Sequence, residues 1–287
     1  MTTTTSIPSG RTTTRLSVRP VRRGTAFATL SGRRFALSAR TPREILVPLL
    51  TPILFALVIA PALATMIPSV GNGLDYQTYV AIGTVGLLVP LSCFFAGIGV
   101  ITDRLGGAQR ELLTAPVPRS IIVFGNLAVA LVVSSLQLVA LVAATVLRGA
   151  HFDATATGVA WFVAAAWMFA VVMYAVAETM ANRIKTQEEY VGAAPAVAIL
   201  PWFLAGSLFP ISALPTWLAG VAKVLPLTHA LALMRYGLLD RRGAGLHEIW
   251  GLSDSTVMAA MSLGVVTLYA AGFTALAVRV FNRSAVR

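Results

Sequence analysis

The residues able to do acid–base, nucleophilic or metal chemistry are few and scattered along the sequence. The three histidines, His151, His229 and His247, lack the i, i+4 spacing that would make a ligand pair on a helix. The only cysteine is Cys93, which excludes a disulfide scaffold and a cysteine-rich metal site. The sequence contains no HExxH or GxSxG motif. We therefore expect no enzyme site, no metal and no cofactor on this chain.

Nucleotide binding by the chain itself is also not expected. A P-loop places a lysine directly after a glycine and before a serine or threonine, where it reaches the phosphates. The two lysines of the sequence, Lys185 and Lys223, follow Ile184 and Ala222. ATP binding through a Walker motif is therefore excluded.

Carboxylates that could couple transport to an ion gradient are missing from the apolar parts of the chain. A buried ionisable group is costly in a membrane and is usually retained for a function. No Asp, Glu, Lys or Arg occurs in six long runs, which are 45–74, 76–102, 120–147, 154–177, 190–222 and 255–278. Glu178 lies just beyond one run, and we expect it to snorkel toward Arg183 or Lys185. Energy for transport would then come from elsewhere.

One short segment combines charges, leucines and prolines in a pattern that suits protein binding. It reads TDRLGGAQRELLTAPVPRS and runs from Thr102 to Ser120. Asp103 can cap a helix over 103–115, and Pro116 and Pro118 would end that helix. The leucines of such a helix can fill a groove on a cytosolic partner, whereas a solvated connector is the simpler alternative.

The elements that position these residues follow from composition. The chain has 287 residues, of which 57% are hydrophobic and 11% charged, and its mean hydropathy is +0.80. This composition excludes soluble and disordered proteins. Each charge-free run is long enough for one helix across a hydrocarbon core of about 30 Å. The sequence therefore predicts an all-α integral membrane protein with six transmembrane helices.

The basic residues predict how these helices are oriented. The net charge of +11 could indicate a nucleic-acid binder, but in a membrane protein an arginine excess first marks the cytoplasmic side. Of the seven segments that flank the runs, the odd-numbered ones carry 17 Lys and Arg, and the even-numbered ones carry 5. We therefore expect both termini in the cytoplasm. Segment 211–254 conflicts with this orientation, because it places four basic residues outside.

The N-terminal region is predicted to have two parts. Residues 1–24 are rich in Thr, Ser and Arg and are expected to form a disordered basic tail. Residues 25–43 place Phe27 and Leu37 near one helical face, on which Arg34 intrudes. We expect this part to be an interfacial helix on the inner leaflet, with simple anchoring of the basic tail to anionic lipid as the alternative.

Three stretches, in this order, resemble the membrane subunits of type-2 ABC exporters, the ABC-2 permeases, of the daunorubicin-resistance type. The first is RTPREILVPLLTPILFALVIAP, a basic and proline-marked entry at 40–61. The second is the segment from Thr102 to Ser120 described above. The third, over 205–239, contains LFP, LPTWL and PLT and closes on an arginine. The resemblance covers about residues 25–283.

The resemblance implies a transmembrane domain over residues 44–283, in the bacterial plasma membrane. Its spans would lie at about 45–67, 78–101, 121–147, 156–180, 190–210 and 256–279. Between the fifth and sixth spans, three prolines within 210–226 favour short re-entrant helices in the outer leaflet. Lys223 and Arg235 would then lie at the outer headgroup level, which softens the conflict in orientation.

The resemblance also implies partners. These are a second permease subunit, in a homodimer or a heterodimer, and a separate ATP-binding subunit that holds ATP and Mg²⁺ and docks beneath the loop between spans two and three. The residues expected at this docking surface are Asp103, Arg104, Arg110, Glu111, Leu112, Leu113, Pro116 and Arg119. Glycines of span two, such as Gly83 and Gly97, could allow close packing across the dimer interface or only locally. No nucleic-acid partner is expected.

The substrates of such an exporter would be amphipathic drugs, antibiotics or lipids, because a charge-free pathway has nothing to pair with a buried ion. The candidate pathway residues are the aromatic side chains Phe94, Phe95, Trp167, Phe209 and Trp217. The main alternative is a secondary transporter or channel-like protein that is not coupled to ATP. A membrane enzyme is the less favoured one.

Overall fold

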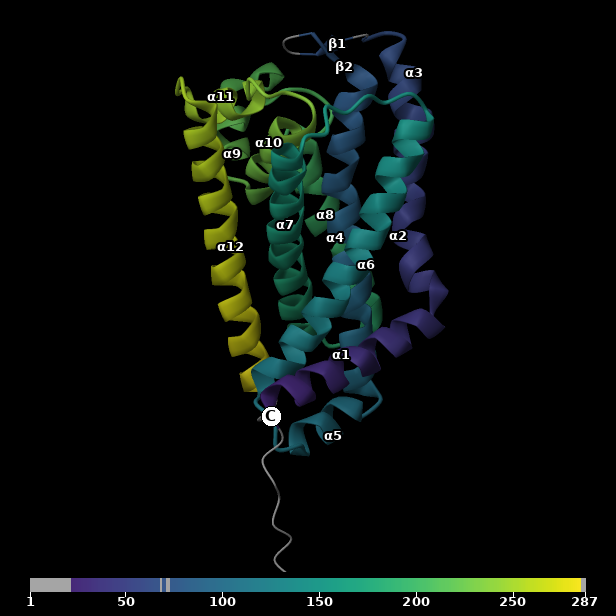
Figure 1. Ribbon diagram of the computed structural model, residues 1–287. Coiled ribbons are helices and arrows are strands. Elements are labelled where there is room, and N and C mark those ends of the chain that lie inside the picture. Colours follow the sequence, from purple (N-terminus) through teal and green to yellow (C-terminus); the bar gives the residue numbers. More distant parts are fainter. Residues whose placement is uncertain (1–21, 68, 71–72, 285–287) are drawn as a thin grey trace, which may run out of the picture.

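Helices make up nearly all of the protein in a computed structural model that describes residues 22–67, 69–70 and 73–284 (Figure 1). In chain order they are α1 (Arg23–Arg40), α2 (Pro42–Leu54), a π-helical turn (Phe55–Ile59), α3 (Ala60–Ala64), α4 (Tyr76–Leu105), α5 (Ala108–Thr114), α6 (Arg119–Leu147), α7 (Ala156–Arg183), α8 (Gln187–Leu204), a 3-10 turn (Ile211–Ala213), α9 (Thr216–Ala222), α10 (Pro226–Leu238), α11 (Ala244–Trp250) and α12 (Ser255–Ser284). A two-stranded antiparallel hairpin, β1 (Ser69–Val70) and β2 (Leu74–Asp75), precedes α4. Residues 1–21 of the predicted tail lie outside the described residues.

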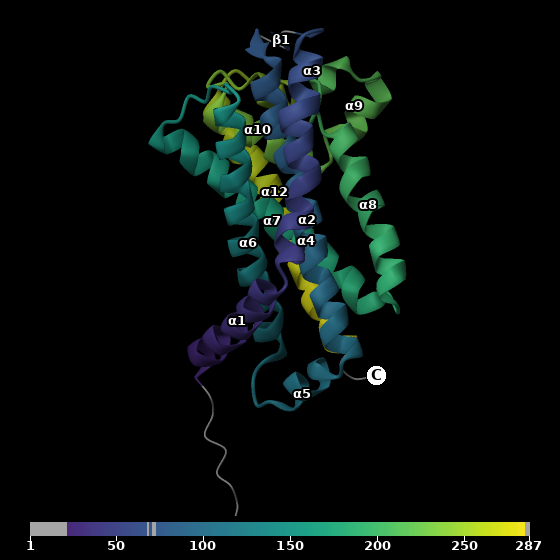
Figure 2. The same ribbon diagram turned by 90° about the vertical axis from the view of Figure 1, so that its right-hand side faces the viewer.

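Helix α4 forms the centre of the bundle, and α2, α6, α7 and α8 all pack on it (Figures 1 and 2). Its glycines are points of close contact within the chain. A side chain at Gly83 would collide with the backbone of Ser207, and one at Gly97 would collide with the Tyr190 ring. These glycines therefore serve packing inside the subunit and not across a dimer interface.

Five helical segments of the described chain are long and apolar enough to cross a membrane, or six if one bent pair counts as a span. The five are Ile45–Ala64, Tyr76–Leu105, Arg119–Leu147, Ala156–Arg183 and Ser255–Arg283. Their apolar length leaves no other place for them than a lipid bilayer, because a helix of 20 residues already spans about 30 Å. The chain is thus an all-α, multi-pass membrane protein.

Helix α8 differs from the predicted fifth span at 190–210. It has 18 residues, two glutamates in its first turn and two internal prolines, so it is less apolar than the five segments above. It ends at Leu204, six residues before the predicted end, because the chain turns at Gly206 with a φ of +78°. Figure 2 shows α8 on the opposite side of α4 from α6.

Helices α9 and α10 form a bent pair rather than a straight helix. Their axes are inclined by 81° across the break at 223–225. Pro226 begins α10, where its missing amide hydrogen costs no hydrogen bond. A straight span over residues 211–235 is therefore excluded, and a re-entrant position in the outer leaflet stays a prediction.

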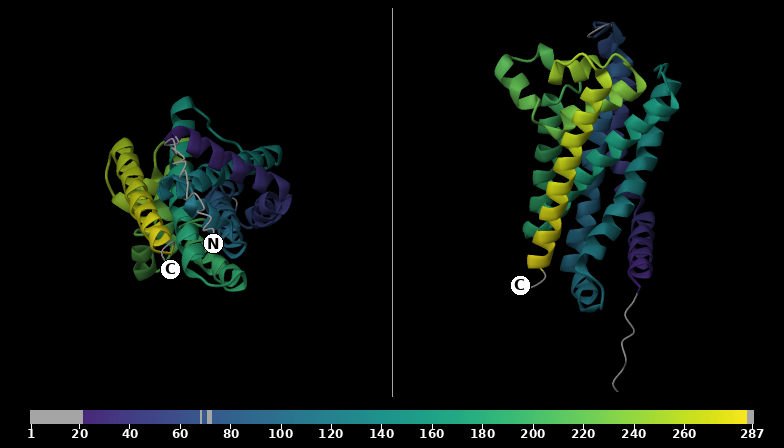
Figure 3. Two further views of the ribbon diagram at one scale, coloured as in Figure 1. Left: turned by 90° about the horizontal axis from the view of Figure 1, so that it is seen from below. Right: turned by 60° about the vertical axis from the view of Figure 1, so that its left-hand side comes forward.

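Helix α1 lies across the α5 end of the bundle and packs on α6 (Figures 1 and 3). The continuous helix predicted for residues 25–43 is interrupted at Thr41, where α2 follows. Phe27 and Leu37 do not pack in the bundle but are 38% and 37% exposed, and the interfacial position of this helix stays a prediction. Arg34 is buried instead, and its Nη2 donates to the Ala96 carbonyl oxygen at 2.9 Å. Because the guanidinium is hydrogen-bonded inside the bundle, its burial costs less free energy than burial of an unpaired charge.

Candidate functional site

Helix α4 continues to Leu105, past Asp103, which was predicted to cap the next helix. Asp103 lies inside α4, and α5 starts after Gly107, whose φ is +81°. The prediction that Asp103 caps the following helix was therefore wrong. Its carboxylate instead accepts two hydrogen bonds from the Arg33 guanidinium, at 3.2 and 3.3 Å. This ion pair joins α1 to the end of α4.

Arg104 ties the end of α4 to the end of α7. Its Nη1 donates to the Ala181 carbonyl at 2.7 Å, and its Nη2 donates to the carbonyls of Ile184 and Lys185 at 2.6 and 3.3 Å. The Ala181 carbonyl is among those that the last turn of a helix leaves without partners, and Ile184 and Lys185 follow that turn directly. A cation at this position also compensates the negative end of the α7 dipole. Arg104, which was predicted at the docking surface, thus holds two helices of the same chain together.

Helix α5 directs its charges outward and its leucines inward. Arg110 and Glu111 are exposed, and so is Pro116 just after the helix. Leu112 and Leu113 are half-buried and pack against the hydrophobic core. The leucines therefore anchor α5 to its own subunit, and a partner would meet mainly the charged side of the helix.

One further residue adds to this surface. Leu105 is 63% exposed at the end of α4, although no pattern in the sequence singled it out. Arg119 begins α6 and donates to the Asn282 carbonyl of α12 at 3.3 Å, so it connects two helices, and its role in docking stays a prediction. We name the outward-facing residues the α5 patch: Leu105, Arg110, Glu111 and Pro116.

The five candidate pathway residues do not meet at one place. Phe94 is buried in the core beside Tyr190, and Phe95 is half-buried. Trp167 is exposed on α7 and donates from Nε1 to the Ser135 hydroxyl at 3.1 Å. The other two, Phe209 and Trp217, follow α8 and are 40% and 73% exposed. The structure thus leaves the pathway itself as a prediction.

A buried carboxylate on α7 has different partners from those predicted. Glu178 is fully buried, and it does not snorkel toward Arg183 or Lys185. Its two oxygens accept hydrogen bonds from the Tyr174 hydroxyl at 2.8 Å and from the Asn182 amide at 3.0 Å. The spacing of these three residues, i, i+4 and i+8, places them on one face of a helix and could have indicated the cluster from the sequence.

A buried arginine lies at the opposite end. Only 7% of Arg235 is exposed, and its expected position at the headgroup level stays a prediction. Its guanidinium donates to the carbonyls of Gly206 and Ser207 at 2.8 and 3.1 Å and lies 3.5 Å from the centre of the Tyr79 ring. It therefore fixes α10 to α4 and to the turn after α8.

One histidine, His229, connects helices of the fold. It is buried, with Nδ1 3.3 Å from the Ser262 hydroxyl and Nε2 2.9 Å from the Lys223 carbonyl oxygen. Trp250 donates to the same hydroxyl at 2.8 Å, which joins α10, α11 and α12. Among the described residues no group of three His, Cys, Asp or Glu side chains could hold a metal ion.

Comparison with known proteins places most of this chain in one family model. The model described as "ABC-2 type transporter" matches residues 25–239, which run from α1 through α10. A short stretch of 44 residues is 43% identical to Nodulation protein J from Sinorhizobium fredii (strain NBRC 101917 / NGR234). That stretch covers 15% of this chain and 17% of the relative.

Proposed function

Because the chain belongs to the ABC-2 type transporter family, we propose that it is the permease subunit of an ATP-driven exporter of amphipathic drugs, antibiotics or lipids. A separate ATP-binding subunit would bind ATP and Mg²⁺ and dock on the α5 patch. A second permease subunit, identical or different, would complete the pathway. Both termini would lie in the cytoplasm of a bacterial cell, in agreement with the excess of basic residues on that side.

The attachment of α5 to the rest of the chain is the observation that carries this proposal. Helix α5 packs on α4, and the last turn of α4 is joined to α1 by the Arg33–Asp103 ion pair and to α7 by the hydrogen bonds of Arg104. Arg119 extends the connection to α12. A push on α5 would therefore reach several helices at once, as a part that transmits ATP-driven movement requires.

The exposed charges of α5 supply the contact surface in this proposal. Arg110 and Glu111 lie on a short helix whose leucines fix it from below. Charges at the rim of an interface set the orientation and the choice of partner. The proposed docking site is thus rigid on its inner side and charged on its outer side.

The substrate pathway would begin or end near the exposed aromatic residues at the α9 end. Trp217 and Phe209 lie where α8 gives way to α9, and both present large apolar surfaces. An amphipathic molecule that leaves the outer leaflet could contact such side chains before it reaches water. Under this proposal Trp217→Ala impairs export and preserves binding of the ATP-binding subunit.

Charge reversal on α5 tests the docking proposal directly. We expect Arg110→Glu to abolish co-purification of the ATP-binding subunit and ATP-dependent transport of an amphipathic dye in reconstituted vesicles. The matched control is Arg23→Glu, which reverses an exposed arginine of α1 at the same end of the molecule. Retained docking and transport in Arg110→Glu would contradict the proposal. Dye flux through the purified chain alone, without ATP, would favour a secondary transporter or channel.

A further inference from the structure

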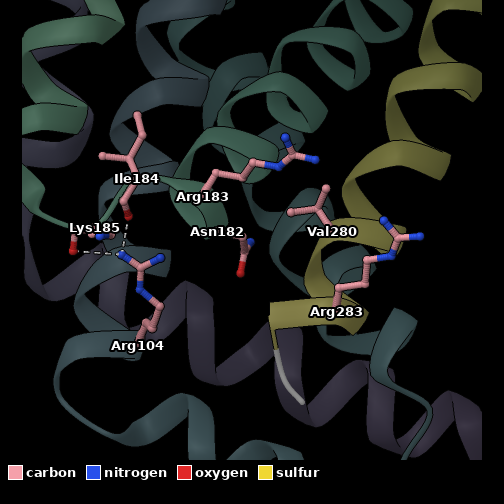
Figure 4. Close-up of a pocket in the computed structure, with 7 residues that line it drawn as sticks. All are labelled: Arg104, Asn182, Arg183, Ile184, Lys185, Val280 and Arg283. Atoms are coloured by element: carbon pink, nitrogen blue, oxygen red, sulfur yellow. Dashed lines mark hydrogen bonds between the residues drawn. The ribbon is translucent and has the colours of Figure 1, made fainter. Parts of the chain in front are cut away.

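An open cavity of about 630 Å³ lies at the α5 end, between the last turns of α7 and α12 (Figure 4). Its described lining residues include four basic side chains and no acidic one: Arg104, Arg183, Lys185 and Arg283, together with Asn182, Ile184 and Val280. The cavity is therefore a concentration of positive charge beside the predicted membrane surface.

Three of these cations are available to a ligand. Arg104 is already engaged by backbone carbonyls, whereas Arg183, Lys185 and Arg283 are exposed. Within the described part of the chain, the one ion pair is that of Arg33 and Asp103, so none of the three has an acidic partner there. Figure 4 shows Arg183 extended toward α12, which carries Arg283.

Among the described residues, the only carboxylate buried near this cavity is not free to neutralise these charges. Glu178 lies one turn before Asn182 on α7, is fully buried, and accepts hydrogen bonds from Tyr174 and Asn182. Glu188 and Glu189 are exposed in the first turn of α8 and do not line the cavity. An anion in the cavity would thus meet cations that are not already paired.

Two further hollows with mostly apolar linings adjoin the cavity along α12, and we call them together the groove. The first of them shares Arg283 with the cavity and is lined by residues of α12 alone, namely Gly272, Ala275, Leu276, Val278, Arg279 and Asn282. The second shares Ala275 with the first and reaches Phe124 on α6. Small residues on α12 leave this space open, and α12 stands at the edge of the bundle (Figure 3). The groove therefore faces lipid and runs from the basic cavity toward the middle of α12.

We propose that this surface binds one anionic phospholipid. Its phosphate headgroup would contact Arg183, Lys185 and Arg283, and one acyl chain would lie in the groove along α12. A basic pocket between transmembrane helices on the cytoplasmic side suits such headgroups. A water-soluble partner could use the cations but not an apolar groove within a spanning segment, so the continuity of the two favours a lipid. Placement in the inner leaflet rests on the proposed orientation, whereas the preference for an anionic headgroup does not.

Binding of phosphatidylglycerol to the purified full-length chain tests this proposal. Native mass spectrometry would compare it with phosphatidylcholine of the same acyl chains. We expect the triple variant Arg183→Gln, Lys185→Gln, Arg283→Gln to bind phosphatidylglycerol about 100-fold more weakly, since each basic residue near an anionic surface contributes a factor of about five. The control Arg23→Gln, Arg40→Gln, Arg43→Gln removes three exposed charges at the same end and should bind normally. Equal losses in both variants, or no preference in the native chain, would overturn the proposal.

Two further arms separate a lipid from other anionic ligands. Ala275→Trp fills the groove and should weaken phosphatidylglycerol binding, whereas Leu268→Trp, on an exposed part of α12 outside the three hollows, should not. Displacement of the lipid by millimolar inorganic phosphate would show a site for free anions and overturn the proposal. Unchanged lipid binding by the triple Gln variant with loss of the ATP-binding subunit would assign the cations to a protein partner and overturn it too.

Discussion

Arginine side chains hold both ends of the bundle, but they do so in opposite ways. At the α9–α11 end, Arg235 is enclosed by protein carbonyls and the Tyr79 ring. At the α5 end, Arg104 is only partly buried, and Arg110 and Glu111 beside it face outward. One end is closed on itself, whereas the other presents charges on a firmly attached base. Such a division is what we expect if movement enters the subunit at α5 and is resisted at the far end.

The largest effect that separates the two ends should come from Arg235→Met. The change leaves the Ser207 carbonyl without its donor and the Gly206 carbonyl with the Tyr79 hydroxyl alone, beside a hollow of only about 40 Å³. We expect a loss of about 3–6 kcal/mol in the free energy of unfolding, because two hydrogen bonds from a charged group are lost and each contributes about 1.5–3 kcal/mol. Unfolding in detergent, followed by circular dichroism, measures it. Arg242→Met, at an exposed position nearby, is the control. An equal loss there would show that the contacts of Arg235 do not stabilise this end of the bundle.

Arg104→Met should have a smaller effect. The carbonyls of Ala181 and Ile184 would lose their donor, but they lie beside the open cavity, where water can replace it. We expect a loss of about 1–2 kcal/mol in the free energy of unfolding. The same unfolding measurement applies, and a loss as large as that of Arg235→Met would show that the two ends do not differ as described.

The smallest effect should be that of the Arg33–Asp103 ion pair. Its side chains are 37% and 18% exposed, so solvent screens the attraction. We expect a coupling energy of about 0.2–1 kcal/mol from a double-mutant cycle with Arg33→Ala and Asp103→Ala, decreasing at high salt. A coupling above about 2 kcal/mol, insensitive to salt, would mean that this contact is as enclosed as the one at Arg235.

Charge positions explain how much of the fold was predictable. Helix α6 ends at Leu147, where the charge-free run 120–147 also ends, because Arg148 marks the return to the polar region. The end of α8 was missed, since Gly206 turns the chain inside an apolar run that carries no charge to mark the boundary. Hydropathy therefore predicts the lengths of the membrane-spanning helices better than it predicts where the chain turns.

The contact partners of individual side chains could not be predicted from the sequence. Arg235 was assigned to the headgroups because an isolated cation is costly in lipid, yet it meets carbonyls 28 and 29 residues away. Leu112 and Leu113 were expected to face a partner, yet they pack on the core of the same chain. In both cases the tertiary contacts decide what a polar or apolar side chain faces, and spacing along the chain does not reveal them.

The position of the ATP-binding subunit is tested most directly by cross-linking in the assembled complex. In a Cys93→Ala background, Arg110→Cys would be compared with Trp217→Cys, which is also at an exposed site but at the opposite end. A short bifunctional thiol–amine reagent should link Arg110→Cys, and not Trp217→Cys, to the ATP-binding subunit. A link from Trp217→Cys, or none from Arg110→Cys in a complex that still co-purifies, would contradict docking at α5.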